Sequence, residues 1–216
     1  MNRTLKVLMA SDMFYFTGFG LVAPIVAIFI KEDLTGGTIF TAGIATTIFI
    51  VIKSLIQLPF SRFIDAHNQK VKWVKIGYTF IILNPFIYFF ADHINYIYLA
   101  EALHGLGSGL AFPAWLGLWS THLDKGHESF EWSLYSTMVG VGSAITAAVG
   151  AAITEFVGFN LTFLMVGVMS IAGFVALFFL KDGHIEKGKQ PIDISEYHTR
   201  QKMHQNHRHN NNKRSI

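Results

Sequence analysis

The sequence has no cysteine, and charged residues make up only 14% of its 216 residues. The absence of cysteine excludes disulfides, thiolate nucleophiles and cysteine-bound metals. Soluble domains carry about 25% charged residues, whereas this chain is 51% hydrophobic and gathers its charges in short segments. The composition therefore predicts a membrane protein with several spans.

Six apolar runs have the length of transmembrane helices, which need about 20 residues to cross the hydrocarbon core. Barrel strands are excluded because they are about 10 residues long and alternate in polarity. The first run continues to Ile30 without a small-residue cleavage site, so it is expected to be a span and not a signal peptide. We expect an all-α six-helix bundle over residues 1–180. The expected spans are Leu8–Ile30, Thr38–Phe60, Val74–Ala91, Ile94–Thr121, Leu134–Phe156 and Leu161–Leu180.

Lysine and arginine are unequally shared between the expected loops. With Met1 on the inside, seven of them lie on the inner side before the tail, whereas only Lys31 lies outside. Short cytoplasmic loops are rich in these residues, so we expect a cell-membrane protein with both termini in the cytoplasm. The seven are Arg3, Lys6, Arg62, Lys70, Lys72, Lys75 and Lys125.

The segment 181–216 is polar and holds eight of the 17 Lys and Arg and five of the ten His. It has too few apolar residues to bury a core, so we expect it to be disordered. Its histidines are irregularly spaced, and we predict neither a metal site nor a cofactor. Orientation in the bilayer explains the net charge of +3 better than nucleic-acid binding does.

Proline and tryptophan also occupy informative positions. Proline removes a backbone donor and bends a helix, and three prolines lie inside spans: Pro24, Pro85 and Pro113. Tryptophan is enriched where spans meet the membrane surface. Three tryptophans are therefore expected in an aromatic belt at the inner side: Trp73, Trp119 and Trp132.

Four ionisable residues stand out inside the spans, because burying such a group in the membrane costs a few kcal/mol and marks it as a functional candidate. Asp12 and Lys53 lie at similar depth on adjacent spans, so we expect them to pair. The pair is either a switch or a static salt bridge, unless Lys53 reaches the inner surface. Glu101 and His104 lie one turn apart on one face. They either take up a proton or reach water at the outer interface.

Small residues predict close helix packing in the fourth and fifth spans. Gly105 and Gly109 form a GxxxG pair in the fourth span. The fifth span carries two rows of small residues at four-residue spacing, which imply close neighbours on two sides, within the bundle or from another chain. The rows are Ser136, Gly140, Ala144, Ala148, Ala152, and Gly142, Thr146, Gly150, Thr154.

The loop expected at Ser61–Trp73 carries the most specific pattern in the chain. It resembles the signature of major facilitator superfamily transporters, which places a Gly, then Asp–Arg four residues later, then a second Gly and basic residues. Asp65, Lys70 and Lys72 match this signature. Three positions depart from it: Ser61 and Asn68 stand for the glycines, and Ala66 stands for the arginine, a role that Arg62 could fill. Asn68 can still make the turn, because asparagine tolerates a left-handed backbone.

Weaker motifs follow in the same order as in that family. Glu101, His104 and Gly105 occupy the places of an Arg–x–x–Gln–Gly motif, and Gly150 alone survives from the antiporter motif of the fifth helix. Residues 158–163 are similar to the family's Gly–Trp–Arg and following Phe. The chain thus resembles the N-terminal six-helix half of a major facilitator superfamily transporter.

This resemblance implies transport of a small solute by alternating access between two six-helix halves. The second half would come from a homodimer or from a separate chain. The cytoplasmic gating residues it implies are Asp65, Asn68, Lys70, Lys72 and Arg62. The coupling or substrate candidates are Asp12, Lys53, Glu101 and His104.

Three other interpretations stay open at this point. The chain is alternatively a membrane scaffold or assembly subunit that transports nothing, or a truncated copy without activity. An intramembrane serine protease built on Ser108 is disfavoured, because Leu106 stands where that chemistry needs glycine and the sixth span has no histidine. We therefore expect no enzyme activity.

Overall fold

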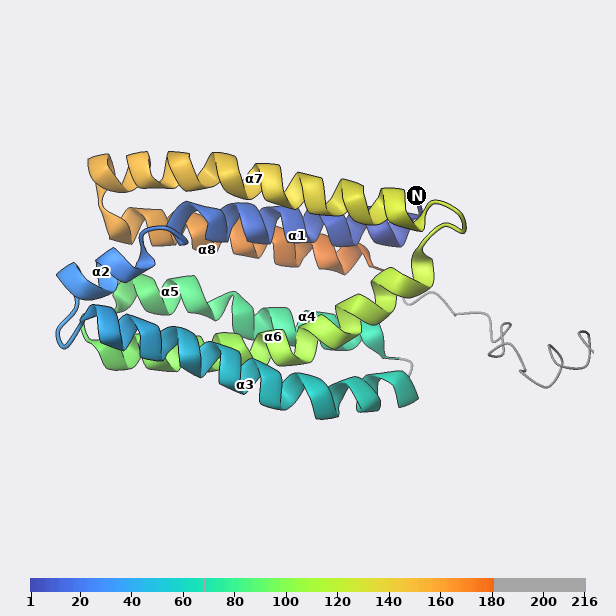
Figure 1. Cartoon of the computed structure of the whole chain (residues 1–216), viewed down its shortest axis with the longest axis horizontal. Helices are drawn as coiled ribbons and strands as arrows, with labels where there is room; N and C mark the ends of the chain where they lie inside the picture. The colour runs from blue at the N-terminus through green and yellow to red at the C-terminus, as the bar shows by residue number, and fades with distance from the viewer. Residues whose placement is uncertain (68, 181–216) are drawn as a thin grey trace, which may run out of the picture. The chain divides into compact units, whose positions relative to one another are not determined.

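The computed structural model describes residues 1–67 and 69–180, in which helices follow one another with short connections and no β-strand occurs (Figure 1). The expected turn at Asn68 and the expected disorder of residues 181–216 lie outside the described residues. The helices are α1 (Arg3–Val22), α2 (Val26–Asp33), α3 (Ile39–Ala66), α4 (Lys70–Ile81), α5 (Leu83–Phe90), α6 (Ile94–His122), α7 (Glu128–Val157) and α8 (Phe159–Ala176), with a 3-10 turn at Leu177–Phe179.

Within residues 1–67 and 69–180, five helical segments are long and apolar enough to cross a membrane: Arg3–Val22, Ile39–Ala66, Lys70–Phe90, Glu128–Val157 and Phe159–Phe179. The remaining long helix, α6, has 29 residues, which exceeds the length that a span needs. Its glycines, Glu101 and His104 lower its mean hydropathy. A sixth crossing by α6 therefore stays a prediction.

Two of the three predicted proline positions interrupt a helix. α1 ends at Val22 and α2 begins at Val26, so the expected first span is broken around Pro24. The expected third span is divided into α4 and α5 at Ile82, because Pro85 cannot donate to the carbonyl of Ile81, four residues earlier. α6, in contrast, continues through Pro113.

The helices extend further into the expected loops than the sequence predicted. Thr38 caps α3 by accepting a hydrogen bond from the Thr41 amide at 3.0 Å, and α3 then continues to Ala66, six residues beyond the expected end of the second span. α7 begins at Glu128, six residues before its expected start, and ends at Val157, where the following Gly158 has a φ of +82° that suits glycine. The expected loop at Ser61–Trp73 is accordingly mostly helical.

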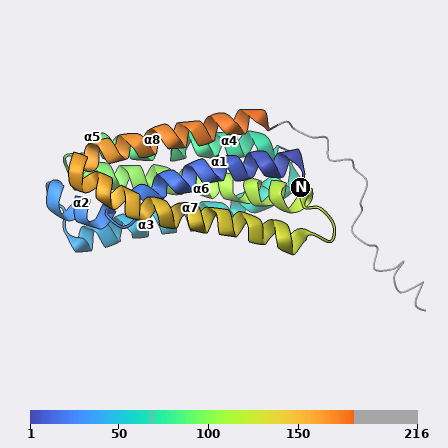
Figure 2. The ribbon, with the colours of Figure 1, turned by 90° about the horizontal axis from the view of Figure 1, so that it is seen from above.

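The long helices form two groups of neighbours (Figures 1 and 2). α1 packs against α7 and α8, and α6 packs against α3 and α4. The α5–α8 and α1–α6 contacts join the two groups. α3 and α7 lie at the margins of this arrangement, and most of their residues are exposed or only partly buried.

Two apolar clusters fill the interior. One includes Leu5 and Leu8 of α1 together with Trp119, and the other includes Leu21 of α1 together with Phe163. Asp12 and Tyr15 lie between these clusters on α1, so a polar layer crosses the bundle between two apolar ones. Trp119 was expected in an interfacial belt, but it is completely buried, and its ring stacks on Trp115 at 5.1 Å.

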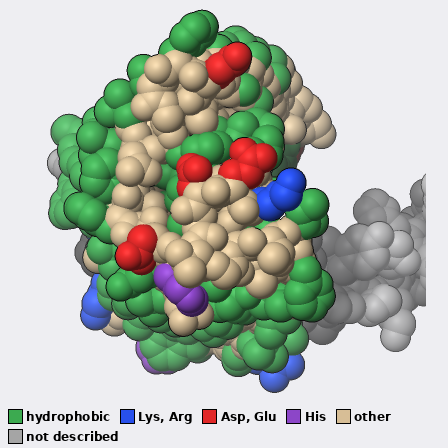
Figure 3. Space-filling view, turned by 90° about the vertical axis from the view of Figure 1, so that its left-hand side faces the viewer, with side chains coloured by type: hydrophobic (Ala, Val, Ile, Leu, Met, Phe, Trp, Pro, Cys, Tyr) green, Lys and Arg blue, Asp and Glu red, His purple; other side chains and the backbone are tan. Residues whose placement is uncertain are grey.

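The two ends of the bundle differ in charge. We call the end with the start of α1 the basic end, because its six Lys and Arg outnumber its four acids among the described residues. The six are Arg3, Lys6, Arg62, Lys70, Lys72 and Lys125, and the four are Asp65, Asp124, Glu128 and Glu131. The opposite end, which we call the acidic end, carries Glu32, Asp33, Asp92 and Glu155, with Lys31 as its one cation among the described residues. Figure 3 views the acidic end, where Asp and Glu side chains gather around a shallow hollow.

Candidate functional site

A cavity of about 210 Å³ lies in the polar layer between the two apolar clusters. Both charged residues expected there, Asp12 of α1 and Lys53 of α3, line it. The other walls are mainly aromatic and come from α1, α3, α4, α6 and α7. They consist of Tyr15, Phe16, Phe49, Tyr78, Ile81, Ser108, Ala111, Phe112, Trp115 and Tyr135.

The carboxylate of Asp12 is 4% exposed and accepts two hydrogen bonds from phenols. Tyr78 of α4 donates to Oδ1, and Tyr135 of α7 donates to Oδ2 at 2.8 Å. These bonds replace the water that a buried carboxylate loses, which lowers the cost of burying it. They also tie α1 to α4 and α7.

The expected ion pair between Asp12 and Lys53 is not formed. Within the described residues, no carboxylate lies within 4.0 Å of the Lys53 ammonium. Its Nζ instead lies 5.1 Å from the ring centre of Phe112 and 5.7 Å from that of Phe49. The prediction was wrong because it used only the depth of the two residues in the membrane. Tyr78 and Tyr135 already donate hydrogen bonds to both carboxylate oxygens of Asp12.

Glu101 and His104 do lie together, with Nδ1 of His104 3.7 Å from Oε2 of Glu101. Glu101 accepts hydrogen bonds from Tyr88 at 2.7 Å and from Asn84 at 3.2 Å, both on α5. Nε2 of His104 lies 2.9 Å from the hydroxyl of Tyr15. The network therefore connects α5, α6 and α1.

This network separates two cavities. Glu101 and Tyr88 line a cavity of about 350 Å³ near α2 and the first turns of α3, on the side of the acidic end. Tyr15 lines the 210 Å³ cavity that also holds Asp12. His104 separates the two cavities and is 7% exposed. The centre of its ring lies 5.2 Å from that of Phe19 and 4.4 Å from that of Phe49. His104 is buried, so it does not reach water at an interface.

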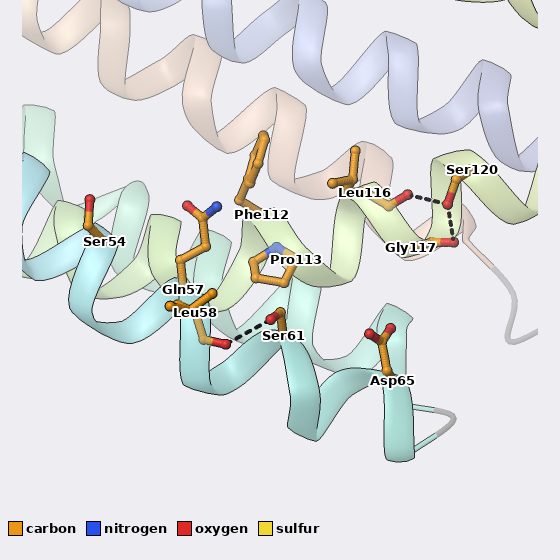
Figure 4. Close-up of a pocket in the computed structure, with 10 residues that line it drawn as sticks. All are labelled: Ser54, Gln57, Leu58, Ser61, Asp65, Phe112, Pro113, Leu116, Gly117 and Ser120. Carbon is orange, nitrogen blue, oxygen red and sulfur yellow. Dashed lines mark hydrogen bonds between the residues drawn. The ribbon is translucent and has the colours of Figure 1, made fainter.

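A groove of about 370 Å³ lies between α3 and α6 towards the basic end (Figure 4). Polar side chains line one face of α3 along it, and Figure 4 shows them directed towards α6: Ser54, Gln57, Ser61 and Asp65. The facing residues of α6 are Phe112, Pro113, Leu116, Gly117 and Ser120. A row of polar groups on a membrane helix is costly against lipid, so this face is suited to protein or water.

Comparison with known proteins agrees with this architecture. The sequence pattern of the Major Facilitator Superfamily matches residues 8–201. The chain belongs to this superfamily.

Two relatives illustrate the match. The chain is 22% identical over 176 residues to "Quinolone resistance protein NorA" of Staphylococcus aureus, which covers 81% of the chain and 44% of that protein. It is 28% identical over 130 residues to "Proton-coupled antiporter flippase LtaA" of Staphylococcus saprophyticus, which covers 58% of the chain and 33% of that protein. The chain thus spans less than half the length of these relatives.

The residues that resemble the superfamily signature are divided between two helices. Arg62 and Asp65 lie in the last turns of α3, whereas Lys70 and Lys72 lie in the first turn of α4. Asp65 is exposed and lines the groove of Figure 4. The side chain of Lys70 covers Gly117 of α6, where an added Cβ would lie 2.6 Å from its Cε.

The predicted glycines lie at close helix contacts. A Cβ at Gly105 or Gly109 would lie 2.7 or 2.9 Å from atoms of α3. On α7, Gly142 faces Thr17, and a Cβ at Gly150 would lie 2.0 Å from the carbonyl oxygen of Leu21. The row of α7 that contains Gly142 and Gly150 therefore packs on α1, whereas the row Ser136, Gly140, Ala144, Ala148, Ala152 is exposed.

Sequence reasoning missed the neutral hydrogen-bonding partners of this site. Tyr15, Tyr78, Tyr88 and Tyr135 hold the charged residues in place, and Asn84 assists them. A detectable signal existed, because these residues lie within apolar helices, where a hydroxyl or amide needs a partner. Among residues 1–67 and 69–180, no three His, Asp or Glu side chains are placed to hold a metal ion.

Proposed function

We propose that this chain forms one half of an alternating-access transporter for a small solute. The observation that carries the proposal is the cavity lined by Asp12, Lys53 and aromatic rings, midway along the helices of a superfamily member. Binding sites of such transporters lie near the membrane midplane, between repeated halves.

The exposed helices α3 and α7 support the need for a second six-helix half. They contribute Lys53 and Tyr135, respectively, to the cavity. The polar groove on α3 and the exposed small-residue row on α7 would be covered by the other half. That half would be a second copy, another chain or more of the same polypeptide.

The charge difference between the two ends supports an orientation with both termini in the cytoplasm. The basic end would face inwards, following the positive-inside rule, and Asp65, Asn68, Lys70, Lys72 and Arg62 would act at the cytoplasmic gate. The 370 Å³ groove that Asp65 lines would then be the contact of this gate with the other half.

Glu101, His104 and Asp12 are proposed as the groups that couple transport to a proton gradient. A carboxylate and an imidazole joined to a tyrosine hydroxyl, between two cavities, can pass a proton from one cavity to the other. Glu101→Gln would remove the acid and keep the acceptors for Tyr88 and Asn84. Glu155→Gln is its control, because Glu155 is an exposed acid at the end of α7.

The test is solute uptake or efflux by the full chain in proteoliposomes, with and without a pH gradient. We expect transport that requires an assembly larger than one copy, and Glu101→Gln should remove the dependence on the gradient while Glu155→Gln keeps it. A monomeric bundle that transports none of a broad solute panel, but binds a membrane partner through the exposed α7 row that contains Gly140 and Ala144, would instead support a scaffold.

A further inference from the structure

We propose that the cavity binds an organic anion with an aromatic body, and that the ammonium of Lys53 recognises its charged group. The inference deepens the proposed function, on which it rests, by naming the class of solute. It depends on the contrast between the two charged residues that share the cavity.

Asp12 is unavailable to a ligand. Its side chain is 4% exposed, and each of its oxygens already accepts a hydrogen bond from a phenol. The rings of Tyr78 and Tyr135 stand with it in the cavity wall. A cationic ligand would have to displace one of these phenols to reach the carboxylate.

Lys53 is available. It is only partly buried, it lines the cavity, and within the described residues it has neither an ion-pair nor a hydrogen-bond partner. Two phenylalanine rings stand 5.1 and 5.7 Å from its Nζ, which is a weak compensation for an ammonium away from bulk water. An anionic group on a ligand would supply the missing partner.

The rest of the cavity fits the body of such a ligand. Phe16, Phe49, Phe112 and Trp115 offer ring surfaces for an aromatic or apolar group. Ser108 of α6, which also lines the cavity, offers a hydroxyl for a second polar contact. The 210 Å³ volume suits a molecule of one or two rings, and a covering second half would enlarge it.

Two probes that share one aromatic ring system but carry opposite charges can distinguish charge recognition by Lys53 from simple hydrophobic binding. The full chain in nanodiscs is titrated with 1-naphthylacetate and with 1-naphthylmethylammonium, and binding is measured by calorimetry and by tryptophan fluorescence, which Trp115 should dominate. We expect the anion to bind at least about tenfold more tightly than the cation, a difference of about 1.4 kcal/mol.

The variants then assign this preference to one residue. Lys53→Met should reduce anion affinity at least about tenfold and leave cation affinity unchanged or raised, whereas Lys53→Arg should keep most of the anion binding. Lys75→Met is the matched control, because its ammonium lies 5.0 Å from the ring of Phe178, and Lys75 does not line the cavity. It should change neither affinity.

Three outcomes would overturn the assignment: tighter binding of the cation, equal losses in Lys53→Met and Lys75→Met, or no binding of either probe. If Lys53→Met does not fold, the anion preference of the wild type and its retention in Lys53→Arg decide the matter. Charge-selective binding without uptake in proteoliposomes would reject transport and leave the anion site standing. Uptake of other solutes without a preference for the anion would support transport and reject the anion site.

Discussion

The hydroxyl of Tyr135 donates to Oδ2 of Asp12 at 2.8 Å and joins residues 123 positions apart in the sequence. Tyr78 donates to the other oxygen, so one carboxylate of α1 connects three helices. Each bond satisfies one oxygen of a carboxylate that is almost completely buried, so losing a donor should cost stability. Asp12 is thus as much a structural centre of the bundle as a candidate for transport.

Tyr135→Phe should lower the free energy of unfolding by about 0.5–2 kcal/mol, the range of hydrogen bonds between membrane helices. Unfolding in detergent measures the change. A double-mutant cycle with Asp12→Asn should give a coupling energy of similar size. Tyr96→Phe is the control, since Tyr96 is 49% exposed and should lose nothing. Equal stability of Tyr135→Phe and Tyr96→Phe would show that the Asp12 bond contributes nothing.

The sequence predicted the all-helical membrane class because its signals are local. Apolar runs of fixed length and short polar segments located the helices, and Ile94–Thr121 agrees with α6 within one residue. Interruptions were harder to predict. Pro24 and Pro85 break their helices, whereas Pro113 does not, and whether neighbours satisfy the freed carbonyl is a tertiary property.

The site was only half predictable for a related reason. Charge and spacing identified Asp12, Lys53, Glu101 and His104, and the i,i+3 spacing of the last two correctly placed them together. The similar depth of Asp12 and Lys53 in the membrane led to the wrong prediction that they pair. In the structure, tyrosines contact Asp12 and phenylalanines lie beside Lys53. The side of a helix that a residue faces depends on packing, which the sequence of an almost uniformly apolar span does not reveal.

Close packing of α7 on α1 predicts opposite results for two glycines of the same helix. Gly150→Ala should destabilise the bundle by about 1–3 kcal/mol, because its Cβ would collide with the Leu21 carbonyl and the helices must separate. Gly140→Ala should be neutral or slightly stabilising, since a Cβ there meets nothing within 4 Å. Thermal unfolding and size-exclusion profiles in detergent compare the two. A Gly150→Ala protein as stable as Gly140→Ala would contradict the packing of α7 on α1.

Membrane orientation can be tested without background labelling, because the chain has no cysteine. Asp65→Cys and Asp92→Cys place single exposed thiols near opposite ends of the bundle. A membrane-impermeant maleimide added to intact cells should label Asp92→Cys, whereas Asp65→Cys should react only after permeabilisation. The reverse pattern would place the basic end outside and remove Asp65 from a cytoplasmic gate.

If the second half is another copy of this chain, the helices that meet in the dimer can be predicted. A two-fold axis along the membrane normal keeps both copies in the same orientation. Because α3 and α7 lie at opposite margins of the bundle and both line the cavity, this axis brings α3 of one copy against α7 of the other. Ser61 on α3 and Ser133 on α7 each lie five residues from the basic-end terminus of their helix, at Ala66 and Glu128 respectively, so they would meet at similar depth.

The double variant Ser61→Cys with Ser133→Cys should therefore form an oxidised dimer, visible on a non-reducing gel, which neither single variant forms through that pair. Ser61→Cys with Val175→Cys is the control: Val175 is 50% exposed near the basic end of α8, which packs on α1 and α5. Equal cross-linking of both pairs would indicate random collision. Uptake without cross-linking of the first pair would exclude this two-fold dimer, because α3 would then be covered by something other than α7 of a second copy.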